Sequence, residues 1–129
     1  MNTKMRIGEL TERAGVTTRT VRYYESLGLL GQSEREGRGF HYYSEETLAR
    51  LHKIDALKQL GLSLEEISSV IDLYFTDPSG IEGKRKVLTI LHTHLAETEE
   101  RISDLQQFRS ELQANISRIQ SYVDQAELS

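Results

Sequence analysis

The side chains best suited to binding chemistry lie in one short segment, TTRTVRYYES, at residues 17–26. The guanidinium groups of Arg19 and Arg22 can bond guanine O6 and N7 in pairs or hold a phosphate, and tyrosine hydroxyls commonly bind phosphate. On a helix, the polar residues of this segment gather opposite Val21 and Tyr24. Such a face favours a charged, planar partner such as nucleic acid; the alternative is an ordinary solvated helix face. The polar face comprises Thr18, Arg19, Arg22, Tyr23 and Ser26.

Two short helices with a tight turn between them must position this face. IGELTERA at 7–14 has apolar residues at helical spacing, and Gly15 follows as a stop signal. Thr17 is a suitable N-cap for a second helix over 18–27, which Gly28 closes. A link of about three residues that contains glycine is typical of a helix-turn-helix, whose second helix enters the DNA major groove.

A glycine-rich hairpin follows in GQSEREGRGFHYYS, residues 31–44. Gly37 and Gly39 mark a turn, and the residues after them are strand formers. The pattern predicts that 32–35 pairs with 40–43, with Arg38 near the tip. A hairpin in this place is a wing, which can lie along the DNA backbone, and we expect Arg38 to touch phosphate there.

Two further helices complete the predicted head. Ser44 caps a helix over 45–60, which Gly61 ends. Ser63 and Glu66 then form a capping box for a fourth helix that runs to about Tyr74. The predicted apolar positions are Leu48, Leu51, Ile54, Leu57 and Leu60 on the third helix, and Ile67, Val70, Ile71 and Leu73 on the fourth.

Residues 75–83, FTDPSGIEG, read as a linker, and no glycine or proline follows it. With Leu88 placed at heptad position a, nine of the eleven a and d sites up to Val123 are apolar, which is typical of a coiled coil. A head of about 75 residues cannot cover a helix roughly 60 Å long, so self-association is the simplest inference. The expected interface residues are Leu88, Leu91, Leu95, Ile102, Leu105, Leu112, Ile116 and Ile119, and Thr98 and Arg109 are the polar exceptions.

Composition narrows the function classes. The chain has no cysteine, which excludes disulfides, thiolate metal sites and thiol redox sensing. Residues 1–62 hold ten basic and eight acidic residues, whereas residues 63–129 hold six basic and twelve acidic residues. This asymmetry favours a different function for each half of the chain. No stretch resembles a signal peptide or a membrane span, and a cytoplasmic protein is expected.

Residues 7–67 resemble the MerR family of bacterial transcription regulators. The resemblance rests on IGELTERAGVTTRTVRYYESLGLL and on GRGFHYYSEETLARLHKIDALKQLGLSLEEI, in the family's order and spacing. It implies a mainly α fold: a winged helix-turn-helix DNA-binding head (1–74) with a small β-hairpin wing, a linker (75–83), a long C-terminal antiparallel coiled-coil dimerisation helix (84–123) and a short tail (124–129). It also implies a homodimer that binds a pseudo-palindromic promoter and distorts an overlong spacer so that RNA polymerase can engage it, usually under effector control.

The resemblance places Thr18, Arg19, Arg22 and Tyr23 on the recognition-helix face. Arg38, His41 and Tyr42 fall on the wing, where the family often has arginine in place of His41. The substitution implies a phosphate contact that is weaker or depends on pH. Lys53 and Lys58 on the third helix are expected to contact the DNA backbone.

The effector site is expected near the start of the long helix, as in the family. Three cations there suit an anionic small molecule, and the alternative is a solvated charged run. His92 and His94 are spaced i, i+2, which does not suit a helical metal site, so neither a metal nor a cofactor is expected. The candidate effector residues are Tyr74, Lys84, Arg85 and Lys86.

Two other classes of function compete with the regulator. A coiled-coil scaffold with an architectural or protein-binding head would share the same pattern but would not show salt-dependent DNA binding. An enzyme is disfavoured because the sequence shows no phosphate-binding glycine loop and no nucleophile–base motif.

Overall fold

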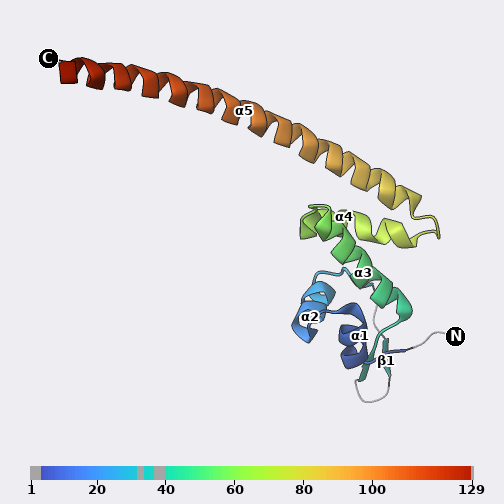
Figure 1. The fold of residues 1–129 in the computed structure, drawn as a ribbon. Helices are drawn as coiled ribbons and strands as arrows, with labels where there is room; N and C mark the ends of the chain where they lie inside the picture. The colour runs from blue at the N-terminus through green and yellow to red at the C-terminus, as the bar shows by residue number, and fades with distance from the viewer. Residues whose placement is uncertain (1–3, 32–33, 37–39, 129) are drawn as a thin grey trace. The chain divides into compact units, whose positions relative to one another are not determined.

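The structure, a computed structural model, describes residues 4–31, 34–36 and 40–128 of the 129-residue chain (Figure 1). The described part is helical apart from one two-stranded sheet and an isolated β-bridge, which confirms the predicted fold class. The chain divides into two compact units, Met1–Ile90 and Leu91–Ser129. The first unit holds the core, and the second is the larger part of one long helix.

The predicted helix-turn-helix is present as α1 (Ile7–Ala14) and α2 (Thr18–Ser26). Gly15 ends α1 with a φ of 70°, in the left-handed region that suits glycine, and its N–H donates to the Thr11 carbonyl. The Thr17 side chain caps α2 by accepting from the Thr20 N–H at 3.1 Å. The capped end of α1 and the capped start of α2 thus fix the turn that sets the direction of α2.

The wing consists of β1 (Glu34–Glu36) and β2 (Phe40–Tyr42), which pair antiparallel with Glu34 opposite Tyr42. The predicted pairing of 32–35 with 40–43 is therefore wrong in its bounds and register. Tyr43 leaves the hairpin because it bridges Met5 instead, through two N–H···O bonds of 2.7 Å. Both side chains are buried, so this bridge seals the head core beneath the wing. The predicted tip, Arg38, lies outside the described residues.

The helix α3 (Glu45–Gln59) begins at the predicted cap, where Ser44 Oγ accepts from the Thr47 N–H at 3.3 Å. Leu48, Leu51, Ile54 and Leu57 are buried as predicted. Leu60 is 54% exposed, so its predicted place in the apolar stripe is wrong. The helix has ended before it, and the chain turns away at Gly61, whose φ is 95°.

The fourth predicted helix changes its winding part-way. α4 (Leu64–Val70) starts with the predicted capping box, in which Ser63 and Glu66 each bond the other's backbone N–H. From Ile71 to Phe75 the chain forms a 3₁₀ helix, η1, rather than continuing as α-helix to Tyr74. In a 3₁₀ helix residues i and i+3 lie one above the other, so Asp72 and Phe75 lie on the same side of η1.

The long helix α5 runs from Ile81 to Leu128. The predicted helix bounds of 84–123, and with them the linker 75–83 and the tail 124–129, are therefore wrong. The helix starts early because Asp77 organises the preceding turn: its carboxylate accepts from the N–H groups of Ser79 (2.8 Å) and Gly80 (3.1 Å). The Ser79 side-chain hydrogen bond, helped by these N–H groups, lowers the pKa of Asp77.

Gly83 lies inside α5, where glycine normally weakens a helix. The ring of Tyr74 explains it, because a Cβ at residue 83 would lie 2.6 Å from a ring carbon. Glycine therefore lets the first turns of α5 pack on η1, and Val87 is buried one turn further on.

Gly83→Ala should destabilise the protein by about 1–3 kcal/mol, because the added methyl group overlaps the Tyr74 ring. Gly8→Ala in α1 is the matched control, since nothing lies within 4 Å of its added Cβ. It should stabilise by up to about 1 kcal/mol. Urea unfolding measures both, and equal stabilisation by the two variants would contradict the close Tyr74–Gly83 contact.

Candidate DNA-binding surface

The two faces of α2 differ as predicted. Val21 and Tyr24 are buried, with 0% and 6% of their surface exposed, so they anchor the helix in the head core. Their partners on the other side are open to solvent, and Tyr23 is 53% exposed. The exposed residues include Thr18, Arg19, Arg22 and Tyr23. A rigid helix thus presents two guanidinium groups and two hydroxyls on one free face.

The wing strand β2 meets α2 at a small hollow of about 240 Å³. Arg22 and His41, which the sequence assigned to separate elements, both line it, together with Ile7, Glu25 and Tyr43. The structure therefore joins the recognition-helix face to the wing in one surface. The His41 ring stacks near that of Tyr43, with ring centres 6.1 Å apart.

Glu25 is a residue of this surface that the sequence did not single out. Glu25 lines the hollow, and its Oε2 atom is buried and accepts no hydrogen bond from the described residues. A buried acceptor without a donor costs free energy. Its place directly after the Arg-Tyr-Tyr run was a signal in the sequence, but its burial was not.

Arg6 is a second residue that sequence analysis missed. Its guanidinium carbon lies 6.0 Å from the centre of the Tyr42 ring, at the limit of a cation–π contact. The Met5–Tyr43 bridge brings the two together. A cation immediately before α1 was visible in the sequence, but its approach to the wing depends on that bridge.

The two lysines of α3 take different places. Lys58 Nζ donates to the Tyr24 hydroxyl at 3.4 Å, so it lies beside α2. Lys53 Nζ lies 4.4 Å from the centre of the Tyr74 ring, which places it beside η1. Contact with the DNA backbone stays a prediction for both lysines. Of the two, Lys58 is the one that lies beside α2.

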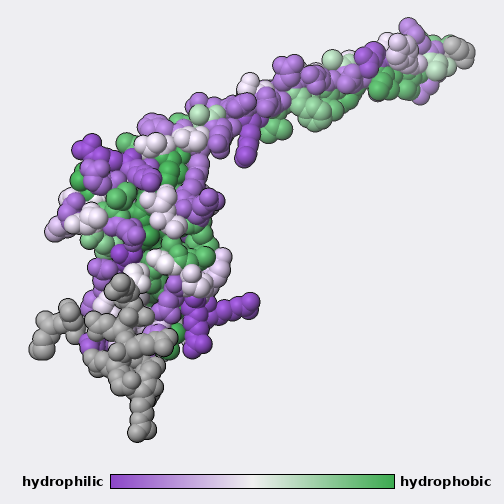
Figure 2. Space-filling view, turned by 180° about the vertical axis from the view of Figure 1, so that it is seen from behind, coloured by the Kyte–Doolittle hydropathy of each residue, from purple (hydrophilic) through white to green (hydrophobic). Residues whose placement is uncertain are grey.

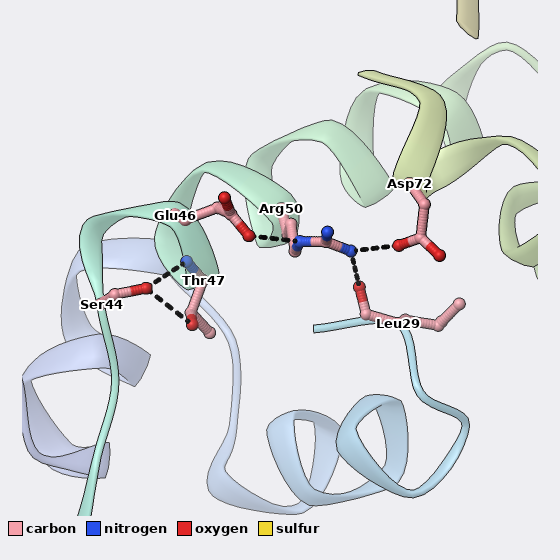
Figure 3. A network of polar contacts seen from close by, with 6 residues as sticks. All are labelled: Leu29, Ser44, Glu46, Thr47, Arg50 and Asp72. Carbon is pink, nitrogen blue, oxygen red and sulfur yellow. Dashed lines mark hydrogen bonds and ion pairs between the residues drawn. The ribbon is translucent and has the colours of Figure 1, made fainter. Parts of the chain in front are cut away.

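A buried arginine on α3 holds the head together (Figure 3). Arg50 is 6% exposed. Its Nη1 donates to Asp72 Oδ1 at 2.7 Å and to the Leu29 carbonyl at 3.3 Å, and its Nε donates to Glu46 Oε2 at 3.1 Å. The guanidinium also lies over the Phe75 ring, 4.8 Å from its centre.

These contacts tie the chain that leaves α2 to both α3 and η1. The 3₁₀ winding of η1 serves this purpose, because it lines up Asp72 and Phe75 on the side that faces Arg50. The sequence carried a partial signal in the i, i+4 pair of Glu46 and Arg50. The contacts with Asp72 and Leu29 depend on the tertiary fold and were not predicted.

The candidate effector residues have local roles in the structure. Tyr74 packs on Gly83, and burial raises the pKa of its hydroxyl. Lys84 Nζ donates to the Ser79 carbonyl at 3.3 Å, and Arg85 Nε lies 3.4 Å from Glu82 Oε1. Lys86 is exposed. These contacts account for Tyr74, Lys84 and Arg85 without a ligand, and the effector role of all four residues stays a prediction.

Across the described residues, the structure gathers no group of three or more His, Cys, Asp or Glu side chains that could hold a metal ion. In the same part of the chain no helix is both long and apolar enough to cross a membrane.

Comparison with known protein families decides the classification. The family model described as MerR HTH family regulatory protein matches residues 5–73, and the MerR DNA-binding model matches residues 48–114. The chain belongs to the MerR family. The match to residues 5–73 covers α1, α2, the wing and α3, so the candidate surface lies within the region that the family's helix-turn-helix model matches.

Individual relatives agree with this classification. The chain is 38% identical to the transcriptional regulator ZntR of Escherichia coli over 84% of this chain and 75% of that protein. It is 37% identical to the nodulation protein NolA of Bradyrhizobium elkanii over 95% of this chain, which spans 52% of that relative. Among solved structures, the lead(II) complex of the regulator PbrR691 from Ralstonia metallidurans aligns with a TM-score of 0.66 and 33% identity, over 84% of this chain and 82% of that one. The chain thus spans about half the length of the nodulation protein.

Arg50→Met should lower the free energy of unfolding by about 1.5–3 kcal/mol. The buried Leu29 carbonyl loses its charged donor, while Glu46 and Asp72 stay largely exposed, which limits the loss from the ion pairs. Arg13→Met is the matched control, because it removes an arginine whose pair with Glu45 lies on the surface. Thermal unfolding of both should show a clear loss for Arg50→Met alone, and equal losses would contradict the role assigned to Arg50.

Proposed function

We propose that the chain is a sequence-specific DNA-binding transcription regulator whose α2 helix reads the major groove. The proposal rests on the exposed face of α2, which carries arginine, tyrosine and threonine side chains. The opposite face of α2 is buried, and the wing strand β2 lies directly beside the helix. Membership of the MerR family supports the proposal.

In this proposal each side chain has a role set by its chemistry. Arg19 and Arg22 bond base edges or phosphates, and the hydroxyls of Thr18 and Tyr23 bond phosphates. The wing residues His41 and Tyr42, with Arg38 at the predicted tip, follow the backbone. Lys58, and Lys53 with it, add phosphate contacts from α3.

The regulator acts as a homodimer through α5. Large apolar side chains remain exposed along the second unit, among them Leu105 at 66% and Ile116 at 64%. Figure 2 shows hydrophobic side chains gathered along one side of the long helix. An exposed apolar stripe of this length marks an interaction site, and its heptad spacing fits a second helix of the same kind. The other predicted interface residues that are exposed are Leu88, Leu95, Ile102, Leu112 and Ile119.

Two heads joined by one interface fit a pseudo-palindromic promoter, since protein two-fold symmetry is mirrored in the two half-sites. The dimer distorts the DNA between the half-sites, and this change of shape lets RNA polymerase engage the promoter. Such a protein is not an enzyme, needs no cofactor and acts in the bacterial cytoplasm, where its DNA lies.

A small-molecule effector controls the switch. PbrR691 was solved with lead(II), but this chain has no cysteine to offer a soft metal as a thiolate ligand. The cations Lys84, Arg85 and Lys86 at the start of α5 instead favour an anionic metabolite.

Arg22→Ala should weaken binding to a specific duplex at least tenfold, because it removes a base or phosphate contact. If the contact is to phosphate, the slope of log affinity against log salt should fall by about one. Arg118→Ala is the matched control, since Arg118 bonds Asn115 on the second unit and lies far along the sequence from α2. Fluorescence anisotropy across a salt series measures both variants. Equal affinity of Arg22→Ala and wild type would refute the role of α2, and salt-independent binding would favour the scaffold interpretation.

Leu105→Asp should convert the dimer to a monomer and thereby abolish tight DNA binding, because it places a charge in the apolar stripe. Gln107→Asp adds the same charge at heptad position f, outside the a and d stripe, and should remain dimeric. Sedimentation velocity distinguishes the two, and a dimeric Leu105→Asp variant with unchanged affinity would show that the coiled-coil interpretation is wrong.

A further inference from the structure

Two polar residues interrupt the apolar stripe of the second unit. Thr98 occupies a d site and Arg109 occupies an a site, and the other nine a and d sites between 88 and 123 are apolar. A polar residue at a core site can specify the register of a coiled coil, at some cost in stability. Their positions therefore say how the two helices of the dimer align.

Arg109 has no carboxylate within reach on its own helix. Helical neighbours lie three and four residues away, and these positions hold leucine or glutamine on both sides. Nearby, Gln107 and Glu111 bond each other at 3.3 Å. A charge in an interface is costly unless it is paired or hydrogen-bonded, so a partner for Arg109 must come from the second subunit.

Thr98 offers a suitable acceptor. Its hydroxyl donates to the His94 carbonyl at 2.8 Å, which uses its single proton. The oxygen lone pairs remain available to accept a hydrogen bond from a guanidinium group.

Parallel and antiparallel alignments of the two helices place Thr98 and Arg109 opposite different residues of the partner helix. A parallel, in-register pair puts Arg109 against the partner's Arg109, which is repulsive. In an antiparallel pair a sites face d sites, and the apolar stripe permits alignments that differ by one heptad. One of them places Arg109 across from the partner's Leu91 and Leu95 across from the partner's Leu105.

The neighbouring alignment brings both polar residues into the same layer. We infer that the dimer adopts this antiparallel register, in which Arg109 of each subunit lies across from Thr98 of the partner subunit. The other layers between residues 88 and 119 are then wholly apolar: Leu88 with the partner's Ile119, Leu91 with the partner's Ile116, Leu95 with the partner's Leu112, and Ile102 with the partner's Leu105. The inference rests on the homodimer proposed above and adds its alignment.

A flanking pair agrees with this register. Arg101 and Phe108 both occupy g sites beside the stripe, and the alignment brings each Arg101 next to the partner's Phe108. Phe108 is 55% exposed in the single chain. A guanidinium group over an aromatic ring is an attractive contact. This pair therefore brings no like charges together beside the stripe.

Disulfide crosslinking tests the register, and the absence of native cysteine gives a clean background. The variant Leu95→Cys/Leu112→Cys keeps Thr98 and Arg109 and should form two symmetric bonds between subunits, because cysteines bridge only when their Cα atoms are within about 7 Å. Leu95→Cys/Leu105→Cys is the matched control, which crosslinks only in the alignment shifted by one heptad. Each full-length variant is oxidised at low concentration and run on a non-reducing gel, and sedimentation of the reduced form reports the oligomeric state.

We expect most of the Leu95→Cys/Leu112→Cys chain to run as a covalent dimer and the control to stay monomeric on the gel. Crosslinking of the control instead, of the single variant Leu95→Cys, or of neither double variant in a protein that sediments as a dimer would overturn the register and leave the homodimer standing. A reduced protein that sediments as a monomer would overturn the homodimer itself.

Arg109→Leu tests whether the arginine selects the alignment. Added to the Leu95→Cys/Leu105→Cys variant, it removes the charge that the shifted alignment would place against the partner's Leu91. The crosslinked fraction should rise several-fold, and an unchanged fraction would show that Arg109 does not set the register.

Discussion

The head depends on one buried guanidinium group. Arg50 holds the carbonyl of Leu29, just after the recognition helix, and the carboxylate of Asp72 on η1, with bonds of 3.3 and 2.7 Å. A lysine could not make these contacts together, because only the planar arginine fork offers several donors in fixed directions and stacks on the Phe75 ring. The exit of α2, the axis of α3 and the 3₁₀ winding of η1 are thus fixed by the same side chain.

This anchoring explains how the head can keep a binding face free. Because the buried residues Val21 and Tyr24 and the Arg50 contacts hold α2 from behind, the side chains on its front need no partner within the head. Charge follows the same division: residues 1–62 carry an excess of basic residues, and residues 63–129 an excess of acidic ones. The proposed phosphate contacts and the proposed helix pairing therefore lie in parts of the chain with opposite net charge.

Local rules predicted much of the fold. Thr17, Ser44 and the Ser63–Glu66 box set helix starts that the structure confirms, because caps act through neighbours in sequence. The predictions were wrong where contacts between residues far apart in the sequence determine the local structure. The hairpin register depends on Met5 bonding Tyr43, and the early start of α5 depends on the Asp77 turn and on the Tyr74 ring that makes room only for a glycine. The recognition face followed from helical spacing, whereas the parts played by Glu25, Arg6 and Arg50 arise only when β2 and η1 pack against the helices.

The most direct test of the account is selection of bound duplexes from a random DNA pool with the purified protein and no added ligand. A dimeric promoter reader should enrich one inverted repeat with a fixed, long centre, since two identical heads read two half-sites at a set spacing. The selected duplex should also lose affinity as salt rises, because the basic face of α2 displaces counterions. Recovery of a single half-site, or of no sequence above the starting pool, would contradict the claim that this chain reads DNA as a symmetric dimer.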